Sequence, residues 1–459
     1  MEQKRKLNAS GYRGIWGKDL DQQISFEYAR AFAKMIKSNG GKKILIGRDT
    51  RKTGPLIFQA VKNAFGKEEV EIEYAGILPT PSMVFLTKKL SFDGGFMITA
   101  SHNPIEYNGL KPIMGTGLLT NEKEAAEIQK LKEELTDQEK IFVPEEKDKE
   151  LTFDNYKYRR LHIEEVLKHI DVKLIKSKKF KIAHDPINAT GSLITKELFK
   201  ELGCEVFVIN EKMTGEFAHM PEPNPENLKG LSELATKNKV NIGFAQDPDA
   251  DRLVVVSEKG EVLFEEYSIV LAIKSVLSKI QNENEQNIVL NMSTSRMGRD
   301  VAESYGAKMN FAKVGEPNVV DLIKSTNAIL GGEGNGGIIF PTINFCRDTL
   351  VGIGLVLELI ARENKPISEI IESFPKYFMK KEKYPAPEDL QPAYKKIKGM
   401  FPEAESTEVD GICLSWPDSS WVHVHPSNTE PIVRIYGEAK TQERIDSLFN
   451  KVRLTLNGK

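Results

Sequence analysis

The sequence predicts an α/β protein in which three similar domains with mixed α/β sheets precede a smaller C-terminal α+β domain, all around a central cleft. Three observations support this prediction. The chain has 459 residues, enough for three or four domains of ordinary size. Apolar strand patterns alternate with amphipathic helix patterns over most of the chain, which is typical of mostly parallel sheets. The last part departs from this alternation, because two of its strand patterns follow each other as a hairpin.

The first domain is predicted over residues 1–150. The amphipathic pattern SFEYARAFAKMIKSNG indicates a helix that ends at a glycine, and KKILIGRDTR reads as a strand followed by a turn. Further helix and strand patterns lead to GGFMITA, an apolar strand that ends just before Ser101. The charged segment that closes the domain reads as a helix and a solvated connector.

The second domain is predicted over residues 151–262 and the third over 263–375. The strand VNIGFAQ runs into DPDADR in the second, and the strand AIL runs into GGEGNGG in the third. The stretch at 350–361, LVGIGLVLELIA, is too short to span a membrane and reads as a core helix. Because strand, glycine-containing loop and helix recur in the first three domains, we suspect an internal duplication.

The fourth domain is predicted over residues 376–459. It reads as a helix, a hairpin formed by GICLSW and WVHVHP, a third strand IVRIYGEA and a last helix. This order favours an α+β domain.

Composition excludes several classes of protein. The 64 basic and 66 acidic residues leave a net charge of −2, which argues against a nucleic-acid-binding protein. No apolar stretch has membrane length and no signal peptide is recognisable, so we expect a cytoplasmic protein without a membrane partner. The three widely spaced cysteines predict neither disulfides nor a metal site. The sequence leaves a monomer or a homodimer open.

The sharpest motif is DPDADR, which places Asp247, Asp249 and Asp251 at alternate positions between two strand patterns. Three neighbouring carboxylates are costly unless a cation neutralises them, and Mg²⁺ prefers carboxylate oxygens. A plain polar turn is the competing interpretation, and an EF-hand is excluded because its glycine and its last glutamate are missing. We therefore predict a metal site, with Arg252 available to bind a substrate anion.

Ser101 follows the apolar strand in TASHNP, at the sheet edge where α/β proteins bind ligands. A serine needs activation to act as a nucleophile, and His102 beside it is a candidate to orient it. Taken alone, His102 would be an ordinary loop histidine and Lys111 an ordinary solvated lysine; Lys111 is nevertheless a candidate proton carrier or phosphate ligand. The stretch lacks the Gly-x-Ser-x-Gly pattern of hydrolases.

Two further loops have the character of ligand sites. Glu333 and Asn335 lie among glycines, which let a backbone approach a ligand closely, and their side chains suit sugar hydroxyls. In PSNTEP, the hydroxyls and amide of Ser427, Asn428 and Thr429 can surround an anion, with Arg434 nearby in the sequence. A flexible turn is the alternative for the first loop and a hairpin turn for the second.

TASHNP, DPDADR, GEGNGG and SNTEP, in this order, resemble the α-D-phosphohexomutase superfamily, and GRDTR and SGYRG extend the resemblance over essentially the whole chain. The resemblance implies interconversion of hexose 1- and 6-phosphates through a phosphoserine at Ser101, with Mg²⁺ held by Ser101 and the three aspartates. It also implies hexose 1,6-bisphosphate as the activator. Catalytic roles are expected for Ser101, His102, Lys111 and Arg252, and substrate contacts for Arg13, Arg48, Lys313, Glu333, Asn335, His425, Ser427, Asn428, Thr429 and Arg434.

Two positions depart from the superfamily pattern. His425 stands where an arginine usually opens the phosphate loop, and we expect a partly charged histidine to bind phosphate more weakly or in a pH-dependent way. Gly337 stands where many relatives have a histidine. The sequences of the loops are most similar to those of archaeal phosphoglucosamine mutases, a branch that overlaps in sequence with phosphomannomutases and phosphoglucomutases. A phosphosugar-binding relative without turnover and a metal-dependent sugar phosphatase remain the alternatives.

Overall fold

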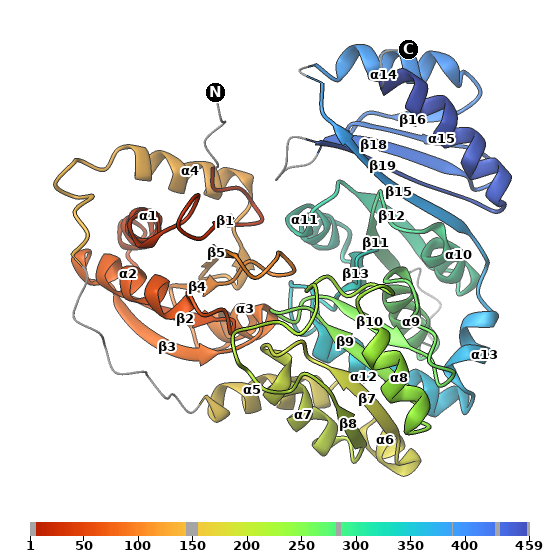
Figure 1. Ribbon diagram of the computed structural model, residues 1–459, viewed down its shortest axis with the longest axis horizontal. Helices are drawn as coiled ribbons and strands as arrows, with labels where there is room; N and C mark the ends of the chain where they lie inside the picture. Colours follow the sequence, from red (N-terminus) through yellow and green to blue (C-terminus); the bar gives the residue numbers. More distant parts are fainter. Residues whose placement is uncertain (1–5, 144–154, 281–285, 388, 427–431, 457–459) are drawn as a thin grey trace.

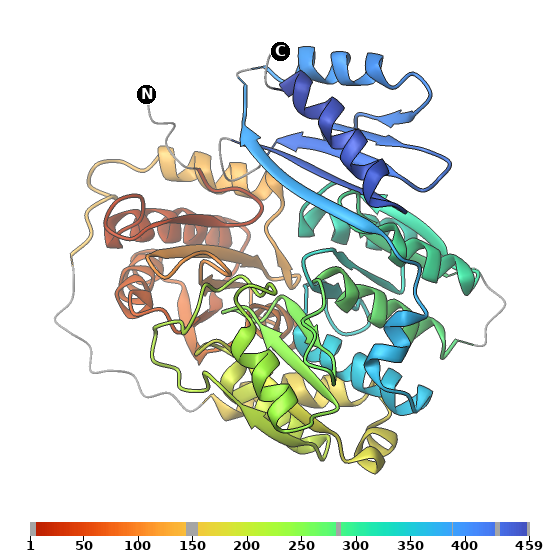
Figure 2. The ribbon, with the colours of Figure 1, turned by 45° about the vertical axis from the view of Figure 1, so that its right-hand side comes forward.

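The computed structural model describes residues 6–143, 155–280, 286–387, 389–426 and 432–456. Its strands form four separate sheets, each built from a consecutive part of the chain. Figures 1 and 2 show the four units following one another around the molecule in chain order. The predicted fold class, three similar α/β domains followed by a different C-terminal domain, is confirmed.

Domain I is built on the sheet order β1-β5-β4-β2-β3, with β6 paired to β5. Strands β2, β3 and β4 are parallel, and β5 runs antiparallel to β4. Its elements are β1 (Tyr12–Ile15), α1 (Gln22–Ser38), β2 (Lys43–Arg48), α2 (Gly54–Lys67), β3 (Glu71–Ile77), α3 (Thr80–Lys89), β4 (Gly94–Ile98), β5 (Tyr107–Met114), β6 (Leu118–Leu119) and α4 (Glu122–Glu133).

Domain II has the sheet order β10-β9-β7-β8, in which only β10 runs antiparallel to its neighbour. Its elements are α5 (Tyr156–Leu167), α6 (Val172–Lys178), β7 (Lys181–Asp185), α7 (Gly191–Glu201), β8 (Glu205–Val208), α8 (Lys229–Lys237), β9 (Ile242–Gln246) and β10 (Leu253–Val256).

Domain III has the sheet order β12-β11-β13-β14, and again the last strand runs antiparallel. Its elements are α9 (Glu266–Leu277), β11 (Asn287–Asn291), α10 (Arg296–Ser304), β12 (Lys308–Ala312), α11 (Glu316–Thr326), β13 (Leu330–Glu333), β14 (Gly337–Ile339), α12 (Thr349–Glu363) and α13 (Ile367–Glu372). The predicted core helix is α12, which is buried along almost its whole length.

The first three sheets share one connection pattern. In each, a central strand (β2, β7 or β11) lies between the next two strands of the chain, and the later of these two turns back as an antiparallel hairpin. The hairpin loops are 99–106, 247–252 and 334–336. The first two loops contain the TASHNP and DPDADR motifs, and the third lies within the GEGNGG motif. The suspected repeat is therefore a repeat of topology, in which the corresponding hairpin loop carries a polar motif in each of the three sheets.

Domain IV is an antiparallel sheet of order β15-β19-β18-β17-β16, covered by two helices (Figure 1). Two of its strands, β15 and β16, are additional to the predicted three. Its elements are β15 (Phe378–Pro385), α14 (Gln391–Met400), β16 (Glu405–Thr407), β17 (Ile412–Ser415), β18 (Trp421–Pro426), β19 (Ile432–Ala439) and α15 (Gln442–Leu456).

The buried apolar residues show which domains are fused. One core joins helices α5 and α7 of domain II to α9 and α12 of domain III. Domain I packs mainly around its own cores, and domain IV has a core of its own. Domains II and III therefore form one packing unit. Within the described residues, no helix has the length and apolar character needed to cross a membrane.

The shared core predicts how one substitution behaves. Leu355 on α12 is fully buried in that core, so Leu355→Ala should lower the free energy of unfolding by about 2–5 kcal/mol. Urea denaturation followed by circular dichroism measures this loss. Leu193→Ala on the exposed side of α7 is the matched control and should change stability by about 0.5 kcal/mol or less. Equal effects of the two changes would contradict the shared core.

Candidate active site

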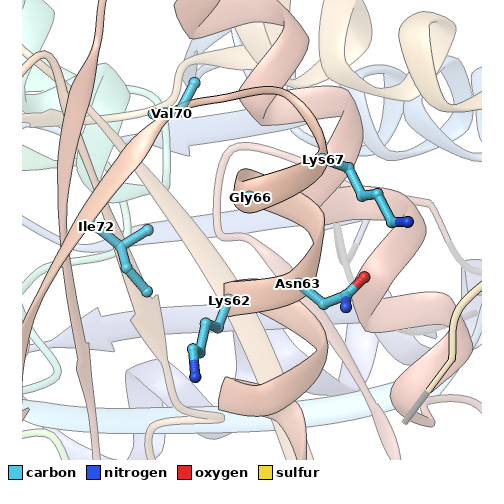
Figure 3. Close-up of a pocket in the computed structure, with 6 residues that line it drawn as sticks. All are labelled: Lys62, Asn63, Gly66, Lys67, Val70 and Ile72. Atoms are coloured by element: carbon cyan, nitrogen blue, oxygen red, sulfur yellow. The ribbon is translucent and has the colours of Figure 1, made fainter. Parts of the chain in front are cut away.

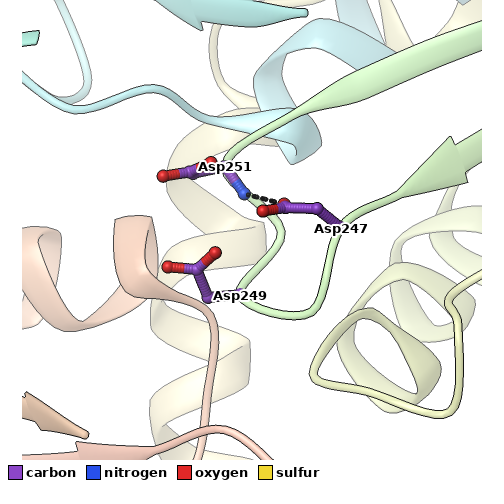
Figure 4. A group of neighbouring side chains, drawn as sticks. All are labelled: Asp247, Asp249 and Asp251. Carbon is purple, nitrogen blue, oxygen red and sulfur yellow. Dashed lines mark hydrogen bonds between the residues drawn. The ribbon is translucent and has the colours of Figure 1, made fainter. Parts of the chain in front are cut away.

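The three aspartates of the DPDADR loop converge in the interior. Asp247, Asp249 and Asp251 are fully buried, and one carboxylate oxygen from each lies within 4.8 Å of the others (Figure 4). We call this group the carboxylate cluster. Oδ1 of Asp247 accepts hydrogen bonds from the backbone N–H groups of Asp251 (3.0 Å) and Arg252 (3.1 Å), which fixes the turn. The loop is therefore a compact concentration of negative charge.

The pKa values of Asp247 and Asp249 are shifted in opposite directions. Burial, then the charges of Asp251 and Asp249, raise the pKa of Asp247 well above its ordinary value. Burial also acts to raise the pKa of Asp249, but Lys111 lowers it below its usual range. The Nζ atom of Lys111 lies 2.6 Å from Asp249 Oδ2 and 3.8 Å from Asp251 Oδ2. The hydroxyl of Thr80 donates a further hydrogen bond to Asp249 Oδ2 at 2.6 Å.

The structure brings Ser101 into contact with the cluster. Its hydroxyl donates a hydrogen bond to Asp247 Oδ2 at 2.9 Å, and the residue is fully buried. Ser101 has a positive φ of 50°, a left-handed conformation that non-glycine residues rarely adopt and that is often found at functional sites. Ser101 and the DPDADR loop thus meet across the boundary of domains I and II, although Ser101 and Asp247 are 146 residues apart in the chain.

The hydrogen bonds around His102 define its tautomer. Arg252 Nη2 lies 3.4 Å from His102 Nε2, and because arginine only donates hydrogen bonds, Nε2 must accept. The ring proton therefore sits on Nδ1, which faces Ser101 Oγ at 3.2 Å. Burial, then Arg252 and Arg13, lower the pKa of His102 well below its ordinary value. A neutral His102 thus donates to the serine oxygen, and the serine hydroxyl donates to Asp247.

Arg13 also faces the cluster. Its Nη1 donates to Asn103 Oδ1 at 3.0 Å in the TASHNP loop. Burial lowers the pKa of Arg13, while Asp249 and Asp251 act to raise it. Arg252, in addition to its contact with His102, pairs with Glu222 at 3.5 Å. Both arginines therefore place positive charge beside the serine.

The glycine-rich loop lies next to the same cluster. Glu333 is buried, and its Oε1 accepts from Asn291 (2.8 Å) and from the backbone N–H of Gly315 (3.1 Å). Asn335 Nδ2 lies 3.4 Å from Glu333 Oε2, and its Oδ1 accepts from Gly337 N at 3.2 Å. Both predicted sugar-binding side chains therefore lie in a defined loop, and Glu333 is already held by neighbours.

Other predicted substrate contacts are not brought to the cluster. Arg48 donates to the hydroxyl of Tyr74 (2.9 Å) and to the carbonyl of Asp49 (3.0 Å). Lys313 is exposed just beyond the end of β12. Arg434 lies on β19, where it pairs in register with His425 on β18. Ser427, Asn428 and Thr429 lie outside the described residues, so the phosphate loop itself stays a prediction.

The expectation that His425 is partly charged near neutral pH is wrong. The ring is buried and stacks on His423, with centroids 4.6 Å apart. Burial, then His423 and Arg434, lower the pKa of His425 to about 3. A neutral imidazole cannot supply charge for a phosphate, so its predicted role as a substrate contact reduces to hydrogen bonding.

Sequence reasoning missed Arg51, the first basic residue of the turn after β2. Its guanidinium is buried and donates to four backbone carbonyls of the serine loop, those of Ser101 (2.8 Å), Asn103 (2.6 Å), Pro104 (2.7 Å) and Tyr107 (2.9 Å). The motif GRDTR contained the signal, since an Asp-x-Arg pair directly after a buried strand is suited to an internal ion pair.

Asp49 completes this support. Its Oδ2 accepts from Arg51 Nε at 3.1 Å and from the Thr99 hydroxyl at 2.6 Å. The Thr99 oxygen in turn accepts from the backbone N–H of Ser101 at 3.0 Å. The unusual backbone of Ser101 is therefore held from both sides. Arg347, also missed, pairs with Asp251 and Glu333 and is considered below.

Comparison with known proteins agrees with this geometry. Four models described as phosphoglucomutase/phosphomannomutase, alpha/beta/alpha domains I, II and III and C-terminal domain, match residues 4–139, 160–260, 265–378 and 379–455. The chain belongs to the phosphoglucomutase/phosphomannomutase family. The resemblance inferred from the motifs is thereby confirmed.

Relatives of the family match over nearly full length. The phosphoglucosamine/phosphogalactosamine mutase of Sulfurisphaera tokodaii is 32% identical over 470 residues, covering 99% of each chain. The phosphoglucomutase/phosphomannomutase of Thermococcus kodakarensis is 34% identical over 452 residues, covering 95% of this chain and 94% of that one. A solved family structure from Burkholderia thailandensis, 24% identical, has a TM-score of 0.84 and covers 100% of this chain and 98% of that one, a likeness of fold.

The carboxylate cluster fits a hard divalent cation. Asp249 Oδ1 and Asp251 Oδ1 are buried oxygens without a hydrogen-bond partner among the described residues. Buried polar atoms normally have partners, and Mg²⁺ prefers carboxylate oxygens. The Ser101 oxygen lies at the same place through its hydrogen bond to Asp247. The donor set of this family member therefore suits the predicted metal.

A cavity of about 360 Å³ lies elsewhere, between α2 and the start of β3 (Figure 3). It is lined by Lys62, Asn63, Gly66, Lys67, Val70 and Ile72. None of the site residues predicted from the sequence lines it. This cavity therefore lies apart from the predicted site.

The support of the serine loop by Arg51 can be tested. Arg51→Ala removes the cation paired with Asp49 and the guanidinium donor of four carbonyls, and loss of one partner of a buried ion pair costs about 3–5 kcal/mol. Urea denaturation should show this loss. Arg51→Lys keeps the charge but cannot reach four carbonyls, so it should recover only part of the stability. Arg160→Ala removes a more exposed ion pair and should cost about 1 kcal/mol or less; an equal loss there would refute the assignment.

The pKa of His425 sets a pH dependence of stability. Below pH about 6.5 the unfolded chain binds a proton at this histidine, whereas the folded protein does not until pH about 3. The free energy of unfolding should therefore fall with decreasing pH, by up to about 1.4 kcal/mol per pH unit from this residue. Urea denaturation at several pH values should show a shallower fall in His425→Phe.

His219 is the matched control for this pH experiment. Burial acts to lower its pKa, but Asp185, 3.1 Å from Nε2, raises it overall. Its stabilising contribution is present at low pH and is lost as pH rises through its folded pKa. His219→Gln should therefore leave the slope below pH about 6.5 unchanged and remove a fall in stability only above that pH. The same change of slope in both variants would contradict the assigned pKa of His425.

Proposed function

We propose that this chain is a Mg²⁺-dependent phosphohexomutase that interconverts hexose 1-phosphates and 6-phosphates. The observation that carries the proposal is the contact of Ser101 with the carboxylate cluster. A buried serine hydroxyl bonded to a metal-type carboxylate, with Arg13 and Arg252 nearby, suits a phosphoryl carrier because phosphoryl transfer needs positioning and charge neutralisation more than covalent chemistry.

The reaction has two half-reactions. Phospho-Ser101 first transfers its phosphoryl group to a free hydroxyl of the bound hexose phosphate: the Ser101 O–P bond breaks and an O–P bond to the sugar forms. The resulting hexose 1,6-bisphosphate turns around in the predicted cleft. It then returns its other phosphoryl group to Ser101. Free hexose 1,6-bisphosphate serves as the activator because it can phosphorylate an unmodified Ser101.

The metal and the protons are assigned as follows. Asp247, Asp249, Asp251 and the Ser101 oxygen would hold Mg²⁺, which supplies neutralisation of phosphoryl charge when bound. Neutral His102, whose Nδ1–H faces Ser101 Oγ, stabilises the leaving serine oxygen by a hydrogen bond as the ester bond breaks. Lys111, a cation paired with Asp249, takes the role of phosphate ligand. The proton lost by the attacking sugar hydroxyl returns to the serine oxygen through solvent, and it moves in the opposite direction in the second half-reaction.

The substrate contacts complete the proposal. Glu333 and Asn335 read sugar hydroxyls, and the loop around Ser427 with Arg434 binds the distal phosphate. Arg13, Arg48, Lys313 and His425 are the further predicted contacts, of which Arg13 lies nearest to the cluster. The names of the relatives favour glucosamine, mannose and glucose phosphates as substrates. Three free cysteines suit a reducing cytoplasm, and the enzyme acts as a monomer or a homodimer.

Phosphorus NMR tests the function directly. The pure protein is incubated with Mg²⁺, a trace of hexose 1,6-bisphosphate and the 6-phosphate of glucosamine, mannose or glucose. Conversion to the 1-phosphate is expected, and the relative rates name the sugar. Ser101→Ala should lose activity by about 10⁴-fold or more, because it removes the group that carries the phosphoryl.

Ser91→Ala is the matched control. Ser91 also has a positive φ, 55°, but it is exposed at the end of α3, so its loss should leave turnover unchanged. Inorganic phosphate without isomerisation would instead identify a sugar phosphatase. Binding of hexose phosphate with neither product would identify a binding protein without turnover.

A further inference from the structure

Arg347 is an arginine whose guanidinium joins carboxylates from three elements. Its Nη2 lies 2.6 Å from Asp251 in the metal loop, its Nη1 lies 2.9 Å from Glu333 in the sugar loop, and its Nε lies 2.9 Å from Glu316 at the start of α11. All four side chains are buried. The two Nη atoms donate hydrogen bonds to their carboxylates, and the Nε contact is an ion pair only. Lysine cannot reproduce this arrangement.

The stem of Arg347 occupies the space beside Gly337. A Cβ atom at position 337 would lie 2.2 Å from Arg347 Cδ and 2.8 Å from its Cγ. Gly337 has no positive φ that would require glycine, so the close approach of the Arg347 stem is the reason for the missing side chain. The two positions are ten residues apart and are sterically linked.

The backbone that carries Arg347 is itself fixed. Asp348 caps α12 by accepting from the N–H of Leu350 at 3.0 Å. Its other oxygen lies 2.8 Å from Nε2 of the buried His162 in domain II, and His162 Nδ1 lies 2.8 Å from the hydroxyl of Ser82 in domain I. Arg347 is therefore placed by contacts with the first three domains.

We propose that Arg347 is a positioning residue of this site: one guanidinium sets Asp251 of the metal loop and Glu333 of the sugar loop in fixed relation, and Gly337 lacks a side chain to make room for it. The expected effect of Arg347 on turnover rests on the proposed function. Its structural role does not, because that role concerns only how the metal loop and the sugar loop, which come from different domains, are held together.

The steric link gives a double-mutant test. Arg347→Ala should lower kcat/KM by about 10- to 100-fold, as expected for the loss of a residue that orients the metal ligands. Gly337→Ala should cause a loss of the same order by displacing the stem. The double variant should be no worse than Arg347→Ala alone, because the displaced residue is already gone.

Gly243→Ala is the matched control for this cycle. It adds a methyl group beside apolar side chains, 2.9 Å from Val256 Cβ, and touches no charge of the site. Its effect should therefore multiply with that of Arg347→Ala. The steric link would be overturned if the losses of kcat/KM caused by Gly337→Ala and Arg347→Ala multiply in the double variant. It would also be overturned if Gly337→Ala leaves kcat/KM unchanged.

Titration calorimetry with Mg²⁺ alone provides a readout that does not depend on turnover. Because the guanidinium lies 2.6 Å from Asp251 and repels a cation, Arg347→Ala should bind Mg²⁺ more tightly while its kcat falls. Arg347→Lys, which keeps charge and most of the stem, should stay near the wild-type affinity for Mg²⁺ and still lose kcat. Arg362→Ala, on helix α12 that follows Arg347 but bonded to Ser278, should change neither quantity.

If Arg347→Ala instead binds Mg²⁺ more weakly and also turns over more slowly, the substitution has loosened the loops in general. That result would overturn the positioning role. A wild-type protein that converts no sugar, in combination with tighter Mg²⁺ binding by Arg347→Ala, would refute the proposed function and still support the placement of Asp251 by Arg347. The two proposals therefore fail in distinguishable ways.

Discussion

The carboxylate cluster is the constraint on which the rest of the site depends. Three carboxylates that share a buried space of a few ångströms repel one another and cannot be solvated by water. Cations from different domains offset part of this repulsion: Lys111 on β5 contacts Asp249, and Arg347 before α12 contacts Asp251. Two of the cluster oxygens still have no hydrogen-bond partner among the described residues. A cluster that is neutralised only in part suits a further cation.

The repeated topology explains how one small volume collects these groups. In each of the first three sheets the polar loop lies at the carboxyl end of a parallel strand, where ligands of α/β sheets bind, and the same hairpin position supplies it. Domain I presents Ser101 there, domain II the three aspartates and domain III Glu333. The common core of domains II and III then fixes two of these loops relative to each other. Arg347 adds a polar link between the same two loops, because it pairs with both Asp251 and Glu333.

Much of this arrangement was accessible from the sequence, and the reason is local. Apolar periodicity marks the strands, and the polar motifs follow directly after them, so Ser101 and Asp247 could each be placed just after the end of a strand. The charged strand β15, FMKKEKYP, lacks such periodicity and was missed because pairing with β19 decides its structure. Arg51 and Arg347 were missed for another reason: an arginine looks solvated in a sequence, and only the fold shows that its partners are buried. The charge of His425 likewise depends on burial against His423, which no motif encodes.

Domain IV is attached by a different kind of contact, and this matters for a ligand that must turn around. Its core is separate from that of domain III, and the junction is made by polar groups. Glu438 accepts from the backbone N–H of Arg296 at 2.8 Å and from Trp421 Nε1 at 3.0 Å, while Arg296 stacks on the Trp421 ring. Polar junctions between domains permit relative motion more readily than a shared apolar core. The domain predicted to bind the distal phosphate is thus the one least fused to the others, whereas the serine, the metal loop and the sugar loop are held together by packing and by buried ion pairs.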